Sequence, residues 1–114
     1  MAIQLCHHRY TAQMYFDNYG GAAGGVNFIV NIIANKEEAK EQTIYFSDAK
    51  GGNSIYWTSD NTLEIQNKDA LQNRSVELLV GQEIYDEHGG ACKTRKIEIQ
   101  FTCYSEDTYR GIRE

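Results

Sequence analysis

The chain has 114 residues, a length that fits one domain with its own hydrophobic core. Hydrophobic residues make up 41% and charged residues 24%, which excludes a disordered chain, and the net charge of -5 disfavours nucleic acid and anionic membranes as partners. No apolar run approaches the ~20 residues of a membrane helix, and Met1 leads into a mixed segment without signal-peptide character. We therefore expect a cytoplasmic protein, or alternatively a cell-envelope domain whose N-terminal anchor has been removed.

The turns of this chain must be built without proline, which is absent, while glycine occurs ten times and tyrosine eight times. Turns that rely on Gly, Asn and Asp are typical of antiparallel β-sheet proteins. Residues 35–42 alone have helical composition, and they are too few for an independent helix, so we interpret them as a solvated connector.

Extended segments with alternating apolar residues follow one another along the chain. In the first of them apolar side chains alternate from Tyr10 to Phe16, and a bulge or a two-sided strand near His7 would explain the change of phase before Tyr10. Val26, Phe28 and Val30 alternate in the second, which also has Ile residues on its other face and is expected to be central. The expected strands cover residues 2–16, 26–33, 43–47, 54–58, 62–66, 75–85 and 92–104.

One short pattern occurs twice, in residues 15–22 and in residues 84–91. Both copies read aromatic, Asp, any residue, Tyr or His, Gly, Gly, Ala. Because glycine enters positive φ without a Cβ penalty, we interpret both copies as the reversals of two long β-hairpins. The second hairpin joins residues 75–85 to residues 92–104.

These elements predict an all-β fold, an antiparallel β-sandwich or a twisted meander of about seven strands, with an open barrel as the alternative. Residues 1–104 would form the single β domain. Residues 105–114 show no apolar period and are expected to form a loose C-terminal tail.

The hairpin tips carry the first candidate site. If the two hairpins pack side by side, their polar groups build one acidic site for a cation or for a basic side chain. The alternative is ordinary turn chemistry, in which Asp caps the turn, glycine takes positive φ, and Tyr or His covers the loop. The polar groups concerned are Asp17, Tyr19, Asp86, Glu87 and His88.

The three cysteines, Cys6, Cys92 and Cys103, form no CxxC pair. Cys92 and Cys103 have an odd separation within one expected strand, which places them on opposite faces, so we expect free thiols in a reducing compartment. A metal site built from Cys6, His8 and His88 is the weaker alternative, because structural zinc sites carry paired ligands at short spacing. We expect no metal and no cofactor.

Catalytic motifs are absent from the sequence. The segment from Gly20 to Gly25 lacks the Gly-Lys-Ser/Thr of a phosphate loop, and a strand follows it instead of a helix. Neither Gly-x-Ser-x-Gly nor His-Glu-x-x-His occurs, so we expect no enzyme. Exposed tyrosine and tryptophan in strands favour a protein interface, although β propensity alone also enriches these residues in strands.

Residues 13–33 and 54–66 resemble a family of small bacterial proteins of unknown function that often carry an N-terminal anchor. The resemblance consists of an extended strand, a Gly-Gly-Ala turn, a hydrophobic strand, and a Tyr56-Trp57 strand with a Leu63-x-Ile65 partner. It implies a β domain and no catalytic residues. The anchor is missing from this chain, which leaves an envelope location in question.

Size, acidity and the lack of a catalytic motif predict a small protein-binding module that neutralises a specific protein, as toxin-immunity proteins and inhibitors do. The partner would be a basic protein such as a toxin or nuclease, with no direct contact to nucleic acid or membrane. The alternative is an envelope-facing structural domain released from an anchor. The expected contact residues are Asp17, Tyr19, Glu37, Glu38, Glu41, Asp86, Glu87 and His88.

Overall fold

Alternating apolar residues form nine β-strands in the described part of the computed structural model. The structure describes residues 2–7, 9–20, 24–34, 41–89, 102–106 and 108–109. For residues 2–7 it describes the backbone only. No helix occurs in these ranges, so the all-β prediction is confirmed, with nine strands in place of about seven. The strands are β1 (Ala2–His7), β2 (Tyr10–Tyr19), β3 (Gly25–Ala34), β4 (Glu41–Asp48), β5 (Gly52–Ser59), β6 (Thr62–Lys68), β7 (Val76–Leu79), β8 (Glu83–Asp86) and β9 (Thr102–Tyr104).

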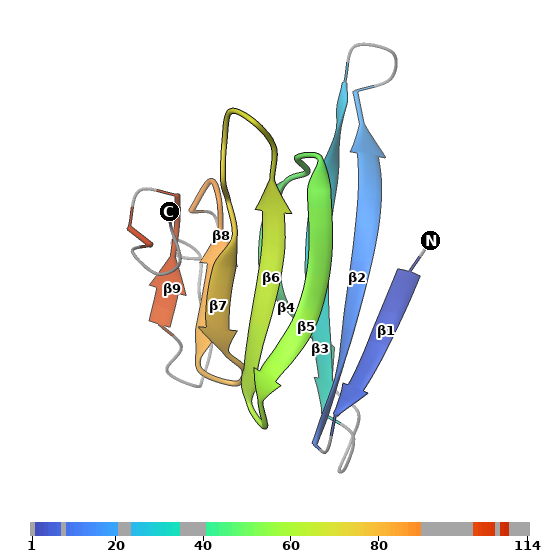
Figure 1. The fold of residues 1–114 in the computed structure, drawn as a ribbon, viewed down its shortest axis with the longest axis vertical. Coiled ribbons are helices and arrows are strands. Elements are labelled where there is room, and N and C mark those ends of the chain that lie inside the picture. The colour runs from blue at the N-terminus through green and yellow to red at the C-terminus, as the bar shows by residue number, and fades with distance from the viewer. Residues whose placement is uncertain are drawn as a thin grey trace.

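The strands build a sandwich of two sheets, shown in Figure 1. The large sheet has the order β1-β2-β3-β4-β8-β9, and the small sheet has the order β5-β6-β7. Strands β1 to β4 form an antiparallel meander, whereas β8 is parallel to both β4 and β9. The chain therefore leaves the large sheet after β4, completes the small sheet, and returns to the large sheet at β8.

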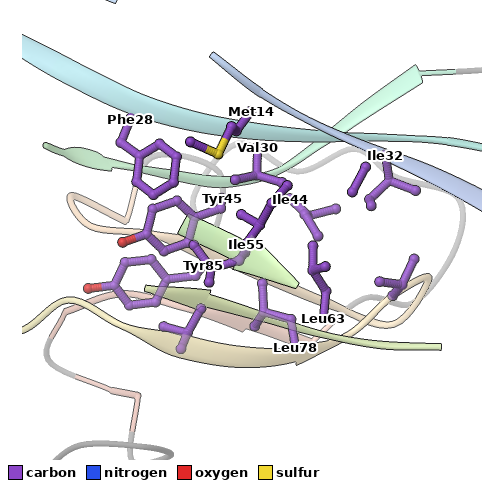
Figure 2. Packing of buried hydrophobic residues seen from close by; sticks show 14 of the residues in the cluster. Met14, Phe28, Val30, Ile32, Ile44, Tyr45, Ile55, Leu63, Leu78 and Tyr85 are labelled. Atoms are coloured by element: carbon purple, nitrogen blue, oxygen red, sulfur yellow. The ribbon is translucent and has the colours of Figure 1, made fainter. Parts of the chain in front are cut away.

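The core lies between the sheets and takes alternate residues from each strand, as Figure 2 shows. Burying one such aliphatic or aromatic side chain contributes about 1.5–3 kcal/mol. The large sheet supplies Ala12, Met14, Phe28, Val30, Ile32, Ile44 and Tyr45, and the small sheet supplies Ile55, Leu63, Ile65, Val76 and Leu78.

Aromatic rings continue the core toward the C-terminal segment. The ring centroids of Tyr45 and Tyr85 lie 5.2 Å apart in a stacked pair, and Tyr85 meets Tyr109 edge-on at 5.9 Å. Tyr109 is buried, and its hydroxyl accepts a hydrogen bond from the N–H of Glu77 at 2.8 Å. The prediction of a loose tail from residue 105 onward therefore does not hold for Tyr109, which packs into the core. Residues 110–114 lie outside the described ranges.

The first expected strand, residues 2–16, is two strands. β1 and β2 pair antiparallel, with Ile3 opposite Met14 and Leu5 opposite Ala12. The bulge or two-sided strand predicted near His7 is therefore wrong, because a chain reversal after His7 changes the phase of the apolar pattern. A reversal and a bulge shift that pattern in the same way, so alternation alone could not separate them.

The hairpin predicted around residues 15–22 is confirmed: β2 and β3 pair antiparallel, with Tyr15 opposite Ile29. The second hairpin is wrong. Residues 75–85 divide into β7 in the small sheet and β8 in the large sheet, and β8 runs parallel to β9. Both halves bury alternate residues in the same core from opposite sides, so their periodicity looked continuous. Residues 92–101 of that expected hairpin lie outside the described ranges.

Candidate functional site

An open pocket lies where the ends of β2, β4 and β8 meet the segment that joins β6 to β7. We call it the end pocket. Polar and charged side chains dominate its wall, together with the two aromatic rings of Tyr19 and Phe46. The lining residues are Tyr19, Asn27, Phe46, Asp48, Lys50, Gln72, Arg74, Glu87 and His88.

Glu87 is positioned by the parallel pairing of β8 with β4, because its N–H donates to the carbonyl of Phe46 at 2.9 Å. Its carboxylate accepts hydrogen bonds from the Ser47 hydroxyl at 2.8 Å and from the Asp48 N–H at 2.7 Å. Burial opposes ionisation of this carboxyl, but the two hydrogen bonds and the nearby Arg74 cation outweigh burial and lower the pKa of Glu87. Glu87 is therefore an anion held inside the fold.

Asp48 is the second carboxylate of the end pocket. It accepts a hydrogen bond from the Tyr19 hydroxyl at 2.8 Å and pairs with the Lys50 ammonium at 3.0 Å. The hydrogen bond from Tyr19 and then the one from Lys50 lower the pKa of Asp48 below its ordinary value. Both oxygens of this carboxylate are thus occupied by groups of the chain itself.

Arg74 balances the remaining charge. Its Nε lies 3.5 Å from Glu87 and has no hydrogen-bond partner among the described residues, and its guanidinium also pairs with Glu106 at 3.2 Å. The Tyr45 hydroxyl donates to the Arg74 carbonyl at 2.7 Å, which fixes the backbone at this point. Arg74 thereby ties the β6–β7 segment to the end of β8 and to the C-terminal segment.

The expected meeting of the two Gly-Gly segments occurs in part, since Tyr19, Glu87 and His88 line one pocket. An acidic cation site does not result, because Lys50 and Arg74 neutralise Asp48 and Glu87. The prediction missed Asp48, Lys50 and Arg74. Nothing in the order of the sequence links Arg74 to Glu87, and no sequence motif marks Asp48 or Lys50 as part of a site. Because both carboxylates are already bonded within the fold, these residues stabilise the structure and are poorly placed to transfer a proton to or from a substrate.

A second candidate is the outward side of the large sheet. Register places Tyr15, Ile29 and Phe46 in one row across β2, β3 and β4, with Asp86 of β8 opposite Phe46. These residues alternate with buried ones along their strands and are half-buried. The neighbouring row consists of Asp17, Asn27 and Asp48.

Glu41 lies on the same side and is held in place by its neighbours. The Asn31 amide donates to its carboxylate at 2.6 Å, and the Tyr15 hydroxyl does so at 3.3 Å. Asp17, Glu41 and Asp86 therefore share one outward surface with the Tyr15 row. We call this surface, the row of Tyr15, Ile29 and Phe46 with Asp17, Glu41, Asp48 and Asp86 around it, the acidic face. Glu37 and Glu38, also predicted as contacts, lie outside the described residues.

The free-thiol prediction is wrong for Cys103, which is disulfide-bonded. The weaker metal alternative falls largely outside the described ranges, since these omit His8 and the side chain of Cys6. Among the described side chains, no three of the His, Cys, Asp and Glu type gather as metal ligands would.

No protein-family model matches the sequence, and comparison with curated proteins and with solved structures finds no match. The resemblance to anchored bacterial β proteins thus stays a prediction. Within the described residues, no helix has the length and apolar character needed to cross a membrane.

Proposed function

We propose that the chain is a non-catalytic binding module that attaches to a basic protein through the acidic face and thereby neutralises it. The observation that carries this proposal is the row of Tyr15, Ile29 and Phe46 on the outward side of the sheet, with Asp17 and Glu41 nearby. An aromatic and aliphatic centre with a polar rim is the composition of protein interfaces.

The charge of the partner follows from the charges around this row. Asp17 and Glu41 are exposed, whereas the carboxylates of the end pocket are already neutralised by Lys50 and Arg74. The chain as a whole carries a net charge of -5, which speeds encounter with a cationic surface. Hydrogen bonds to Glu41 fix its side chain in advance, so less conformational entropy is lost on binding.

The test begins with capture of partners from source-organism lysate, salt elution, and identification of a stoichiometric basic protein. Affinity for that protein is then measured for the double variant Asp17→Lys, Glu41→Lys. We expect at least about tenfold weaker binding, slower association, and loss of inhibition of the partner's activity. Circular dichroism and thermal melting check that the variant is folded.

The matched control is the double variant Glu64→Lys, Glu77→Lys, which changes net charge equally but lies on the outward side of the small sheet. We expect its affinity to stay within about twofold of the parent. Equal weakening by both variants would show that only net charge matters. The absence of any stoichiometric basic partner at low salt would overturn the proposed function.

A second candidate, an envelope-facing structural domain, is favoured by the disulfide at Cys103, because disulfides persist mainly in oxidising compartments. Alkylation of the protein directly from its source cells separates the candidates. One alkylated cysteine indicates an oxidising location, and three indicate a reducing one.

A further inference from the structure

The ring of Tyr19 lies against the backbone of the neighbouring strand β3. Gly25 is directly opposite Tyr19 in the register of β2 and β3. A Cβ added at Gly25 would lie 2.6 Å from the Tyr19 hydroxyl oxygen and 2.9 Å from its Cζ, so only glycine leaves room for the ring in this position. The hydroxyl then donates to Asp48 of β4 at 2.8 Å. The ring therefore extends from β2 over β3 toward β4 and is held at both of its ends.

This fixed ring is also accessible. Tyr19 is 44% exposed, and it lines the end pocket together with Phe46. Because the hydrogen bond to Asp48 already restricts the side chain, a ligand that stacks on the ring loses little further conformational entropy. The end pocket thus has an aromatic surface that is in place before any ligand arrives.

Polar groups with unused hydrogen-bonding capacity line the same pocket. The side chain of Lys50 is only 10% exposed, and within the described residues its ammonium donates to Asp48 alone, which uses one of its three N–H groups. The side-chain amides of Asn27 and Gln72 also line the pocket and make no hydrogen bond to another described residue. A ligand that bonds to these groups replaces water there, and a bond to the largely buried ammonium of Lys50 is the most favourable of them.

The charges of the pocket favour a neutral ligand. Its lining contains two carboxylates and two basic side chains, and they pair as Asp48 with Lys50 at 3.0 Å and Glu87 with Arg74 at 3.5 Å. A cation or an anion would therefore find no uncompensated opposite charge in this lining. The net charge of -5 further disfavours phosphorylated and other anionic ligands.

We propose that the end pocket binds a neutral saccharide, with one sugar ring stacked on Tyr19 and its hydroxyl groups bonded to Asn27, Lys50 and Gln72. A hydroxyl both donates and accepts, so it can bond to an ammonium and to either end of an amide. The C–H groups on the face of a sugar ring carry small positive charges, which the negative face of an aromatic ring attracts. The pocket volume of about 570 Å³ lies within the usual range of small-molecule sites.

The saccharide pocket and the acidic face can be tested separately. The partner protein of the proposed function would contact the row of Tyr15, Ile29 and Phe46, whereas the saccharide would contact the ends of the strands at Tyr19 and Gly25. Phe46 belongs to both sites and is therefore left unchanged in the variants below. The saccharide proposal does not depend on whether a basic protein partner exists.

The experiment is calorimetric titration of the full chain with neutral hexasaccharides of glucose in two linkages, xylose, mannose and N-acetylglucosamine. We expect at least one of them to bind with a dissociation constant between about 10 μM and about 1 mM. The corresponding monosaccharide is titrated in parallel, and weaker binding of it would show that the pocket takes a sugar chain. The absence of binding by every hexasaccharide up to about 10 mM overturns the proposal.

The first variant is Tyr19→Ala, which removes the aromatic surface and should weaken binding at least about tenfold. Its matched control is Tyr56→Ala on the small sheet, because Tyr56 is also 44% exposed. The affinity of the control should stay within about twofold of the parent. Unchanged affinity in Tyr19→Ala, or an equal loss in both variants, overturns the proposal.

The second variant, Gly25→Ala, keeps every side chain that lines the pocket and changes only the position of the Tyr19 ring. The added methyl group forces the end of that side chain to move off β3, a shift that a flexible side chain makes at little cost to the fold. We expect at least about fivefold weaker saccharide binding and a melting temperature within a few degrees of the parent. Parent-like affinity in a folded Gly25→Ala protein would show that the placed ring does not bind the sugar and would overturn the proposal.

Discussion

The two copies of the repeated pattern share the backbone angle of their first glycine and have different surroundings. Gly20 in the first copy has a φ of 77°, and the equivalent Gly89 in the second has a φ of 76°. Yet the first copy connects β2 to β3, which pair antiparallel. The second copy begins in β8, which runs parallel to both of its neighbours, β4 and β9. The shared pattern therefore specifies a positive φ at its first glycine and does not specify which strands pair.

Burial distinguishes the copies residue by residue. Phe16 is 40% exposed, but the equivalent Tyr85 is 3% exposed and stacks on Tyr45. Asn18 is exposed, whereas the equivalent Glu87 is bonded to Ser47, Asp48 and Arg74. The first copy is thus a local turn at the surface, and the second is a junction that joins the two sheets.

The largest expected effect comes from the aromatic position of each copy. Tyr85→Ala should lower the free energy of unfolding by about 3–5 kcal/mol, because it empties a buried site between other rings. Phe16→Ala should cost only about 1 kcal/mol, because the ring that it removes is already partly in water and stacks on the single ring of Phe28. Urea unfolding measures both, and similar values would contradict the distinction between the copies.

An intermediate effect is expected from Glu87→Gln, which keeps the shape but removes the anion beside the largely buried Arg74. We expect a loss of about 2 kcal/mol near neutral pH, and less than about 0.5 kcal/mol for Asn18→Ala at the equivalent position. Because folding lowers the pKa of Glu87, its stabilising contribution is present above the ordinary glutamate value of about 4.3 and is lost as pH falls below it. Urea unfolding from pH 7 to pH 3 should therefore show a smaller acid-dependent loss in the variant, and an unchanged pH profile would contradict this role of Glu87.

The smallest effect is expected at the glycines and tests what the two copies share. Gly89→Ala should cost about 1 kcal/mol, because alanine is strained at positive φ. Gly20→Ala should cost up to about 2 kcal/mol, because its added Cβ would lie 2.7 Å from the Gly24 Cα, against 3.6 Å from the Ser105 Cβ at Gly89. Thermal melting of the two variants checks this order, and a neutral substitution at either position would show that the turn does not need glycine there.

The sequence was sufficient for the features that depend on neighbouring residues. Alternation from Tyr10 to Phe16 and from Val26 to Ile32 predicted the β2–β3 hairpin, and the short strands around Trp57 and Leu63 were placed within a few residues. These elements pair with the next strand along the chain, so periodicity and turn residues contain the information that specifies them.

The rest depends on contacts between residues far apart in the chain. The ion pair of Arg74 with Glu87 and the hydrogen bond from Ser47 to Glu87 exist only because β8 returns beside β4. Likewise, nothing in the pattern from Val76 to Ile84 shows that the chain changes sheets at Gly81, where φ is 92°. The neutralisation of Asp48 and Glu87 in the end pocket could therefore not be predicted from the sequence without the topology.

The return of β8 to the large sheet also has a consequence for how the molecule assembles. Ser47 and Glu87, which bond across β4 and β8, are separated by 40 residues, and the intervening chain must first become compact for these strands to meet. The meander from β1 to β4 needs only short loop closures and has no such requirement. From this connectivity we expect the meander and the small sheet to form first, and the large sheet to be completed last, when the chain closes through Glu87.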